Sequence, residues 1–226
     1  MNHILHIDTS TKICSIALST NGELIDYTSY EGDGFVHSEL LTSFIESILH
    51  KNQLTPKDIS AISVASGPGS YTGLRIGVSS AKGLCYALNI PLIAIDSLFS
   101  IASWAKQNEP NFKGNFCAMI DARRMEVFSA IFSNDLKLLK PISADILDEN
   151  SYSEFTSKEN LLLAGDGTEK TKSIWENREN ILFSAYLSDA RGQINEAYKR
   201  FLEKQFEDVA YFEPYYLKDF ILGTKK

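Results

Sequence analysis

Apolar and polar residues alternate regularly along the first half of the chain. Two stretches near the start show the period of two that is typical of strands, and Asn21-Gly22 forms a preferred hairpin turn into a third. Short apolar runs farther on indicate buried strands, and apolar positions at helical spacing indicate helices. The expected strands are 3–8, 12–20, 23–30, 59–66 and 91–96, and the expected helices are 35–51, 72–88 and 97–106, the last with Ser97 as its N-cap. This order predicts an α/β fold with a mixed sheet flanked by helices.

The second half repeats the opening of the first. The segment IDTSTKICSIAL (7–18) is echoed by IDARRMEVFSAIF (120–132), and each contains a strand ending in Ile-Asp, a short loop and a second alternating strand. The repeat predicts two lobes of related fold, which we place at residues 1–107 and, smaller and more divergent, at residues 108–226. The other elements expected in the second lobe are strands at 161–165 and 181–184, a helix near 188–206 and an aromatic tail at 210–220.

The glycine-rich segment SGPGSYTGLRIG (66–77) resembles a phosphate-binding loop only at first sight. It lacks the Gly-Lys-Ser of a nucleotide-binding P-loop, and Thr72 stands where the dinucleotide fingerprint needs glycine. Pro68 and Thr72 also occupy the glycine positions of a hydrolase nucleophile elbow around Ser70. We interpret the segment as a tight turn into a helix capped by Ser70 or Thr72, and weak anion binding at that helix N-terminus stays open.

Three glycines lie within the helix that is expected to follow. Gly73, Gly77 and Gly83 each disfavour the helix by about 1 kcal/mol relative to alanine, so a compensating reason is expected. Gly73 and Gly77 lie with Ser80 on one face of small residues. We predict that this face lets another helix approach closely.

Composition and charge narrow the possible functions. The 226 residues are 44% hydrophobic, carry 22 Lys and Arg against 29 Asp and Glu, and have a net charge of −7. No run reaches the roughly 18 apolar residues of a membrane span, and the N-terminus lacks a signal-peptide pattern, so we expect a cytoplasmic chain without a membrane partner. The basic residues are scattered and the net charge is negative, so the chain alone is expected to bind nucleic acid poorly.

No local pattern indicates a catalytic centre. The histidines, His3, His6, His37 and His50, have no metal-ligand spacing, and the three cysteines form no close pair. We therefore assign no catalytic residue, no metal and no cofactor.

One acidic arrangement leaves an alternative open. Asp8, Asp96 and Asp121 each end an expected strand, where they either terminate the strand or gather around Mg²⁺. The turn that begins Asp8-Thr9-Ser10 is rich in hydroxyls and is a weak candidate for phosphate binding. The alternative function is thus an ATP-using or metal-dependent enzyme of the actin-like or ribonuclease-H-like fold.

Several motifs together resemble one family. The segments HIDTST (6–11), HSELL (37–41), SGPGSYTGLRIG (66–77), AKGL (81–84), PLIAIDSL (91–98) and EPYYL (213–217) are similar to those of the Gcp-like TsaB family, also called YeaZ. This family takes part in the synthesis of threonylcarbamoyladenosine in bacterial tRNA. The resemblance implies two ribonuclease-H-like or actin-like lobes of the ASKHA superfamily, in agreement with the repeat.

The resemblance also implies a role without catalysis. TsaB proteins are partners of the catalytic paralogue TsaD, which carries metal-binding histidines spaced H-x-x-x-H and modifies adenosine 37 of tRNA. The matching stretch here, Asp96 to Ile101, contains no histidine. The expected function is a dimerization or scaffold subunit that binds TsaD, joins the ATPase TsaE, forms a possible homodimer when alone and meets tRNA only through the complex.

The partner surface is expected on two helices. Apolar positions from Val36 to Leu49 cover an arc of roughly 220° on the first helix, more than its own core needs. We predict that one stripe of each helix packs on the chain's own sheet and the other on a partner, the alternative being that both helices are buried within the chain. The candidate interface residues are Leu40, Leu41, Phe44, Ile45, Ile48, Gly73, Leu74, Gly77, Val78 and Ala81.

Overall fold

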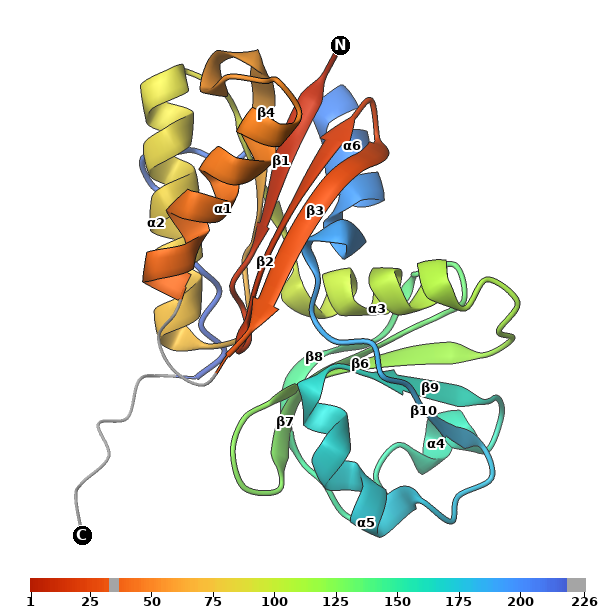
Figure 1. The fold of residues 1–226 in the computed structure, drawn as a ribbon. Helices are drawn as coiled ribbons and strands as arrows, with labels where there is room; N and C mark the ends of the chain where they lie inside the picture. Colours follow the sequence, from red (N-terminus) through yellow and green to blue (C-terminus); the bar gives the residue numbers. More distant parts are fainter. Residues whose placement is uncertain (33–36, 219–226) are drawn as a thin grey trace, which may run out of the picture.

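Two five-stranded sheets, one in each of two lobes, form the framework of the chain (Figure 1). The computed structural model describes residues 1–32 and 37–218. The first sheet contains β1 (His3–Asp8), β2 (Ile13–Thr20), β3 (Glu23–Glu31), β4 (Ile59–Ala65) and β5 (Leu92–Ile95), and the second contains β6 (Asn115–Asp121), β7 (Glu126–Phe132), β8 (Leu138–Ile146), β9 (Leu161–Ala164) and β10 (Ile181–Phe183). The helices are α1 (His37–Lys51), α2 (Tyr71–Leu88), α3 (Ser97–Asn108), α4 (Ser153–Thr156), α5 (Lys172–Trp175) and α6 (Ile194–Leu202), with 3-10 turns η1 (Pro56–Asp58), η2 (Asp166–Thr171) and η3 (Ala190–Gln193).

The two sheets have the same topology. Their strand orders are β3-β2-β1-β4-β5 and β8-β7-β6-β9-β10, so in each an antiparallel meander of three strands is followed by two parallel ones. The hairpins that the sequence repeat identified, β1–β2 and β6–β7, occupy equivalent places. The prediction of two related α/β lobes with mixed sheets is confirmed.

The first sheet is covered by helices on both faces (Figure 1). One face buries Leu5, Ile7 and the apolar side of α1 and α2, and the other buries Ile4 and Ile93 against Ala197 of α6. This arrangement explains why β1 and β4 are almost wholly buried strands rather than alternating ones. No helix within residues 1–32 and 37–218 combines the length and apolar character needed to cross a membrane.

Helix α3 passes from the first sheet to the second. Its N-cap is Asp96, whose Oδ1 accepts a hydrogen bond from the Phe99 amide at 2.7 Å, so the prediction of Ser97 as the cap is wrong by one residue. The Ser97 hydroxyl instead accepts from the Gly67 amide at 3.0 Å and anchors the glycine loop. The body of α3 packs its apolar side on the second sheet, while α6 returns to the first. A domain boundary after residue 107 therefore remains a prediction.

The second lobe contains elements that the sequence did not reveal. Strand β8 is an edge strand with Pro141 in its middle, and its pairing with β7 shifts register near Ile131, so its apolar pattern is broken. Helices α4 and α5 have only four residues each, too short for a periodic signal. The helix expected near 188–206 is shorter, because Asp189 caps the 3-10 turn η3 before α6 begins.

A stacked arginine joins the two lobes. The Arg191 guanidinium lies 3.6 Å from the ring centre of Tyr27 on β3 and 4.1 Å from that of Trp104 on α3. It also pairs with Asp189 through two hydrogen bonds, of 2.9 and 2.7 Å. Arg191 thereby holds an edge strand of the first sheet, α3 and η3 in one contact.

We expect Arg191→Lys to lower the free energy of unfolding by about 1–2 kcal/mol, because lysine keeps the charge but loses the planar stack and the paired hydrogen bonds. Urea denaturation followed by circular dichroism measures the change. Arg124→Lys, at an exposed position of the β6–β7 turn, is the matched control and should stay within about 0.5 kcal/mol of the parent. Equal effects of the two substitutions would show that the stack does not stabilise the fold.

Candidate functional site

The glycine loop is bound by the chain itself. The Ser70 hydroxyl caps α2 by accepting from the Gly73 amide at 3.2 Å, which decides between the two candidates, Ser70 and Thr72. The Ser70 amide donates to the Ser10 carbonyl at 2.7 Å, so it is paired with the β1–β2 turn. Two of the amides at the start of α2 are therefore already used within the chain.

Three glycines let the β1–β2 turn lie directly on α2. A Cβ at Gly69 would stand 2.3 Å from the Ser10 carbonyl oxygen, and one at Gly73 only 2.1 Å from that of Thr9. At Gly77 it would meet the Thr9 hydroxyl at 2.2 Å. The close approach that Gly73 and Gly77 permit is thus to the chain's own turn, and the prediction that another helix fills this face is wrong.

The weak cofactor candidates lie together in this buried turn. Asp8 is fully buried, and its Oδ1 accepts hydrogen bonds from the Ser10 amide and hydroxyl at 2.9 and 2.6 Å. The Thr9 hydroxyl donates to the Gly73 carbonyl at 2.7 Å. Asp8 Oδ2 has no hydrogen-bond partner among the described residues. Burial raises the pKa of Asp8 to about 6, which the hydrogen bonds from Ser10 oppose and Asp189 reinforces. The polar groups of the turn thus bind one another, the start of α2 and Ser188.

The carboxylates that end strands do not gather into one site. Asp96 caps α3, and Asp121 pairs with Lys170 at 2.8 Å in the second lobe. Across residues 1–32 and 37–218 no three His, Cys, Asp or Glu side chains are grouped so as to hold a metal ion. Two of the histidines are buried and hydrogen-bonded within the chain: His6 to the Ser19 hydroxyl and His37 to the Thr11 carbonyl.

Most of the predicted interface residues lie in the core of the first lobe. Five of them are part of that core: Leu41, Ile45, Ile48, Val78 and Ala81. Leu74, Gly73 and Gly77 are buried as well. Leu40 and Phe44 on α1 are half-buried and pack on the outside of this core, and Ile76 and Leu84 on α2 do the same. Val36 lies outside the described residues. Part of the apolar surface left on these two helices is a strip that we call the α1–α2 outer face: Leu40, Phe44, Ile76, Gly83 and Leu84. Tyr86 of α2 is exposed beyond this strip.

Gly83 differs from the other helical glycines. No heavy atom lies within 4 Å of the position a Cβ would take, so the fold itself does not require glycine there. Gly83 nevertheless lies inside α2, where alanine would favour the helix. No contact within the described residues accounts for this glycine.

The C-terminal segment, which contains the EPYYL motif, lies along α2 and contacts the glycine loop. Lys82 donates to the Phe212 carbonyl at 2.7 Å, and the Tyr215 amide donates to the Ser66 carbonyl at 2.7 Å. A Cβ at Gly67 would stand 2.5 Å from the Tyr215 carbonyl oxygen. Gly67 is therefore needed for the tail to lie against the loop.

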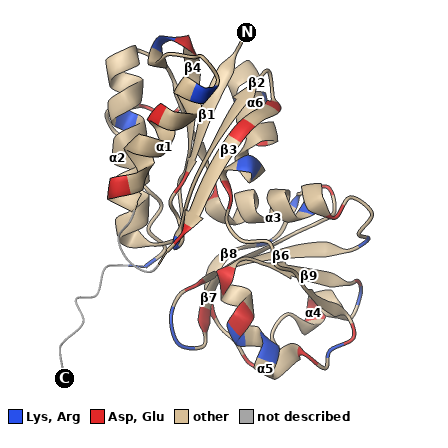
Figure 2. Ribbon diagram, in the orientation of Figure 1, with Lys and Arg blue, Asp and Glu red and all other residues tan. Residues whose placement is uncertain are grey.

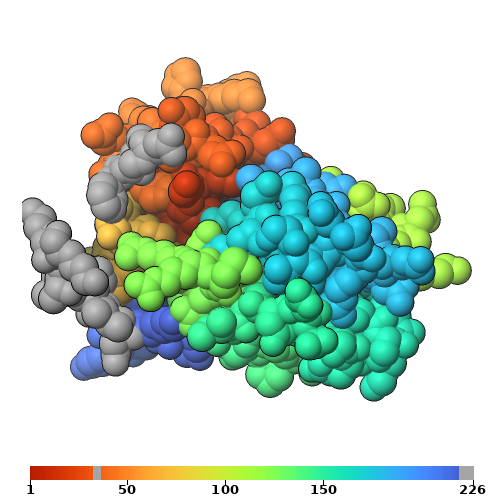
Figure 3. All heavy atoms as spheres, turned by 90° about the horizontal axis from the view of Figure 1, so that it is seen from below, coloured from red at the N-terminus to blue at the C-terminus, as the bar shows by residue number. Residues whose placement is uncertain are grey.

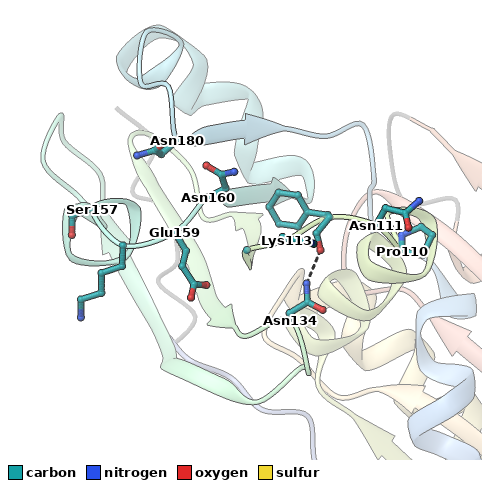
Figure 4. A pocket seen from close by; sticks show the side chains of 11 residues that line it. Pro110, Asn111, Lys113, Asn134, Ser157, Glu159, Asn160 and Asn180 are labelled. Carbon is teal, nitrogen blue, oxygen red and sulfur yellow. Dashed lines mark hydrogen bonds between the residues drawn. The ribbon is translucent and has the colours of Figure 1, made fainter.

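A concavity of about 810 Å³ lies on the second lobe, apart from all these residues (Figure 4). Asn134, Asn160 and Asn180 from three different turns line it, and the Asn134 amide donates to the Phe112 carbonyl at 2.7 Å. None of the residues singled out by the sequence lines this concavity.

We expect Asp8→Asn to stabilise the protein at neutral pH. The folded-state pKa of about 6 lies above the reference value of 3.8, so the parent loses stability as pH rises from about 4 to 6 and the carboxyl ionises. The free energy of unfolding of the variant should exceed that of the parent by up to about 3 kcal/mol above pH 6 and match it below about pH 4. Thermal denaturation across this range tests the difference. A difference that does not change with pH would contradict a buried, unpaired Asp8.

We expect opposite effects of alanine at two glycines of the same helix. Gly73→Ala should lower the free energy of unfolding by about 1–3 kcal/mol, because its Cβ meets the Thr9 backbone. Gly83→Ala should raise it by about 0.5–1 kcal/mol, because the site is open and alanine favours a helix. Urea denaturation of both variants gives the two values. Similar values would show that helix propensity alone matters at both positions.

Comparison with known proteins places these features in a family. Residues 35–220 match the model of the TsaD family, described as tRNA N6-adenosine threonylcarbamoyltransferase. The tRNA threonylcarbamoyladenosine biosynthesis protein TsaB of Bacillus subtilis (strain 168) is 38% identical over 143 residues, 63% of this chain and 60% of that protein. TsaB of Buchnera aphidicola subsp. Baizongia pistaciae (strain Bp) is 31% identical over 172 residues, 74% of this chain and 76% of that protein.

A solved structure shares the fold over nearly the whole chain. YeaZ from Pseudomonas aeruginosa superposes with a TM-score of 0.81 over 96% of this chain and 100% of its own, at 24% identity. The matched region spans only about three fifths of the length of the Bacillus relative. The chain belongs to the TsaB (YeaZ) family, within the wider family that the TsaD model describes.

Proposed function

We propose that this chain is a non-catalytic subunit of the complex that makes N6-threonylcarbamoyladenosine at adenosine 37 of tRNA. In this proposal it binds the catalytic paralogue TsaD through the α1–α2 outer face and serves as a scaffold. The curated relatives are named for the biosynthesis of this nucleoside, which gives the pathway. The binding surface is proposed from the half-buried apolar side chains and the open glycine on α1 and α2.

The single observation that carries the proposal is Gly83. An exposed glycine inside a helix is unfavourable unless something approaches the backbone closely, and nothing within the described chain does so. The half-buried side chains of Leu40, Phe44, Ile76 and Leu84 lie on the same two helices. A helix of a partner that packs here would bury these apolar groups and use the space over Gly83.

The non-catalytic role is supported by the contacts of the residues that were candidates for catalysis or ligand binding, because these residues have structural hydrogen bonds. The stretch that matches the metal-binding histidines of TsaD forms the start of α3, where Asp96 caps the helix and Ser97 binds the glycine loop. Thr9 and Ser10 are turned into the packing against α2. These residues build the lobe, and the catalytic groups would come from the partner.

Further partners follow from the same proposal. The ATPase TsaE would join the pair, tRNA would be recruited by the complex, and two copies of this chain would pair through the α1–α2 outer face when TsaD is absent. The net charge of −7 is consistent with weak binding of tRNA by the chain alone.

Co-expression with the TsaD paralogue of the same source, followed by co-purification and a tRNA modification assay, tests the proposal. We expect a stable pair and modified tRNA only when both chains are present. Modification by this chain alone would favour the alternative of an enzyme with its own catalytic site.

We expect Gly83→Leu to abolish pairing with TsaD while the chain stays folded, because leucine fits the open position but blocks a helix from approaching. Phe44→Glu should weaken pairing as well, since it places a charge on the same face. Light scattering measures pairing, and circular dichroism confirms the fold.

The matched control is Leu24→Glu on β3, an exposed leucine on the opposite side of β2 from the central strands. It should leave pairing at the parent level. Normal pairing by a folded Gly83→Leu variant would place the interface elsewhere.

A further inference from the structure

The turn between β6 and β7 carries two arginines in an unusual backbone conformation. Arg123 and Arg124 have φ values of 72° and 51°, in the left-handed region that residues other than Gly, Asn and Asp rarely adopt. The equivalent turn of the first lobe is buried against α2, but this one is exposed. A turn chosen only for its geometry would favour Asn and Gly here, so the arginine side chains themselves need an explanation.

Neither guanidinium is paired within the chain. Within residues 1–32 and 37–218, Arg123 and Arg124 have no side-chain hydrogen bond or ion pair. The two carboxylates that flank the turn are already matched by other cations: Asp121 binds Lys170 at 2.8 Å, and Glu126 binds Lys218. The turn therefore carries excess positive charge on a chain whose net charge is negative (Figure 2).

Tertiary structure brings other basic and aromatic groups to the same place. The ion pair of Lys218 with Glu126 fixes the C-terminal segment beside the turn, and Figure 3 shows this segment next to the second lobe. Two residues earlier, the Tyr216 hydroxyl accepts from Arg75 Nε at 3.3 Å. Arg75 also lies 4.1 Å from the ring centre of Tyr71. The Arg75 guanidinium thus lies near two aromatic rings, those of Tyr71 and Tyr216, and Lys218 joins the same C-terminal segment to the second lobe.

We propose that Arg123 and Arg124 bind the phosphate backbone of RNA when this chain is part of its complex. Lys218 keeps its ion pair with Glu126, and Arg75, which the same C-terminal segment contacts, is a further cation. The planar guanidinium donates two parallel hydrogen bonds that match phosphate oxygens. An exposed aromatic ring beside cationic groups provides a stacking surface for an unpaired base, and Tyr215 of the C-terminal segment is 48% exposed. The patch is small and the rest of the chain is acidic, so it contributes contacts to RNA that the complex holds and does not capture RNA alone. This inference rests on the proposed function, because the complex supplies the RNA.

The test uses Arg123→Asn combined with Arg124→Gly in the complex with TsaD. Asn and Gly suit the left-handed backbone, so the fold should be kept or slightly stabilised while both guanidinium groups are lost. We expect about a tenfold weaker affinity for an unmodified tRNA transcript at about 150 mM salt. The slope of log affinity against log salt concentration should fall in magnitude by about 1.5, which corresponds to two phosphate contacts.

The matched control is Lys57→Ala with Lys158→Ala. It removes the same charge from two exposed positions outside the patch, and should leave both affinity and salt slope unchanged. A loss of equal size in this control would show that net charge alone decides RNA binding and would overturn the proposal. Unchanged tRNA affinity and slope in the arginine variant would overturn it as well.

Two further measurements test whether the two arginines bind a free nucleotide or the partner protein instead of RNA. A titration with ATP in place of tRNA tests a free nucleotide: weaker ATP binding with intact tRNA binding would overturn the assignment to RNA. Loss of pairing with TsaD in the arginine variant would mean that the arginines contact the partner protein, and this too would overturn it. Failure of the parent chains to pair or to modify tRNA would instead disprove the proposed function.

Discussion

The contact between the β1–β2 turn and the glycine face of α2 holds the first lobe together. Strand β1 is central in its sheet, and α2 follows β4 directly, so the turn and the helix must meet where the chain leaves the sheet. Side chains at Gly69, Gly73 or Gly77 would overlap Thr9 and Ser10. The glycine-rich motif of the family is therefore explained by backbone packing, and its likeness to a phosphate loop is incidental.

This packing also decides where function can reside. A turn whose hydroxyl and amide groups bind α2 has few of them left for a ligand, so the hydroxyl-rich turn is a structural element in this chain. The outer sides of α1 and α2 remain accessible, and Gly83 is the one helical glycine among the described residues that no internal contact explains. In our proposal the functional surface is therefore the α1–α2 outer face and not the buried turn.

The two lobes share a topology but use their equivalent hairpins differently. The β1–β2 turn buries Thr9, Ser10 and Thr11 and exposes Lys12, whereas the β6–β7 turn exposes both Arg123 and Arg124. Arg191 fixes the lobes to each other between Tyr27 and Trp104, and the Thr11 hydroxyl meets that of Ser188 at 2.5 Å. The C-terminal segment adds a third connection through Lys218 and Glu126. These contacts give the second turn a defined position relative to α2.

The sequence by itself determined the features that short-range patterns encode. Strand alternation, the Asn21-Gly22 turn and the repeated hairpin are all local, so they predicted the first sheet and the two related lobes correctly. Tertiary structure alone decided what each residue meets. Asp96 rather than Ser97 caps α3 because Ser97 is drawn to the Gly67 amide, and Gly73 faces Thr9, 64 residues earlier in the chain. Edge strand β8 and the basic patch were equally invisible, since pairing and proximity between distant segments leave no periodic signal in the sequence.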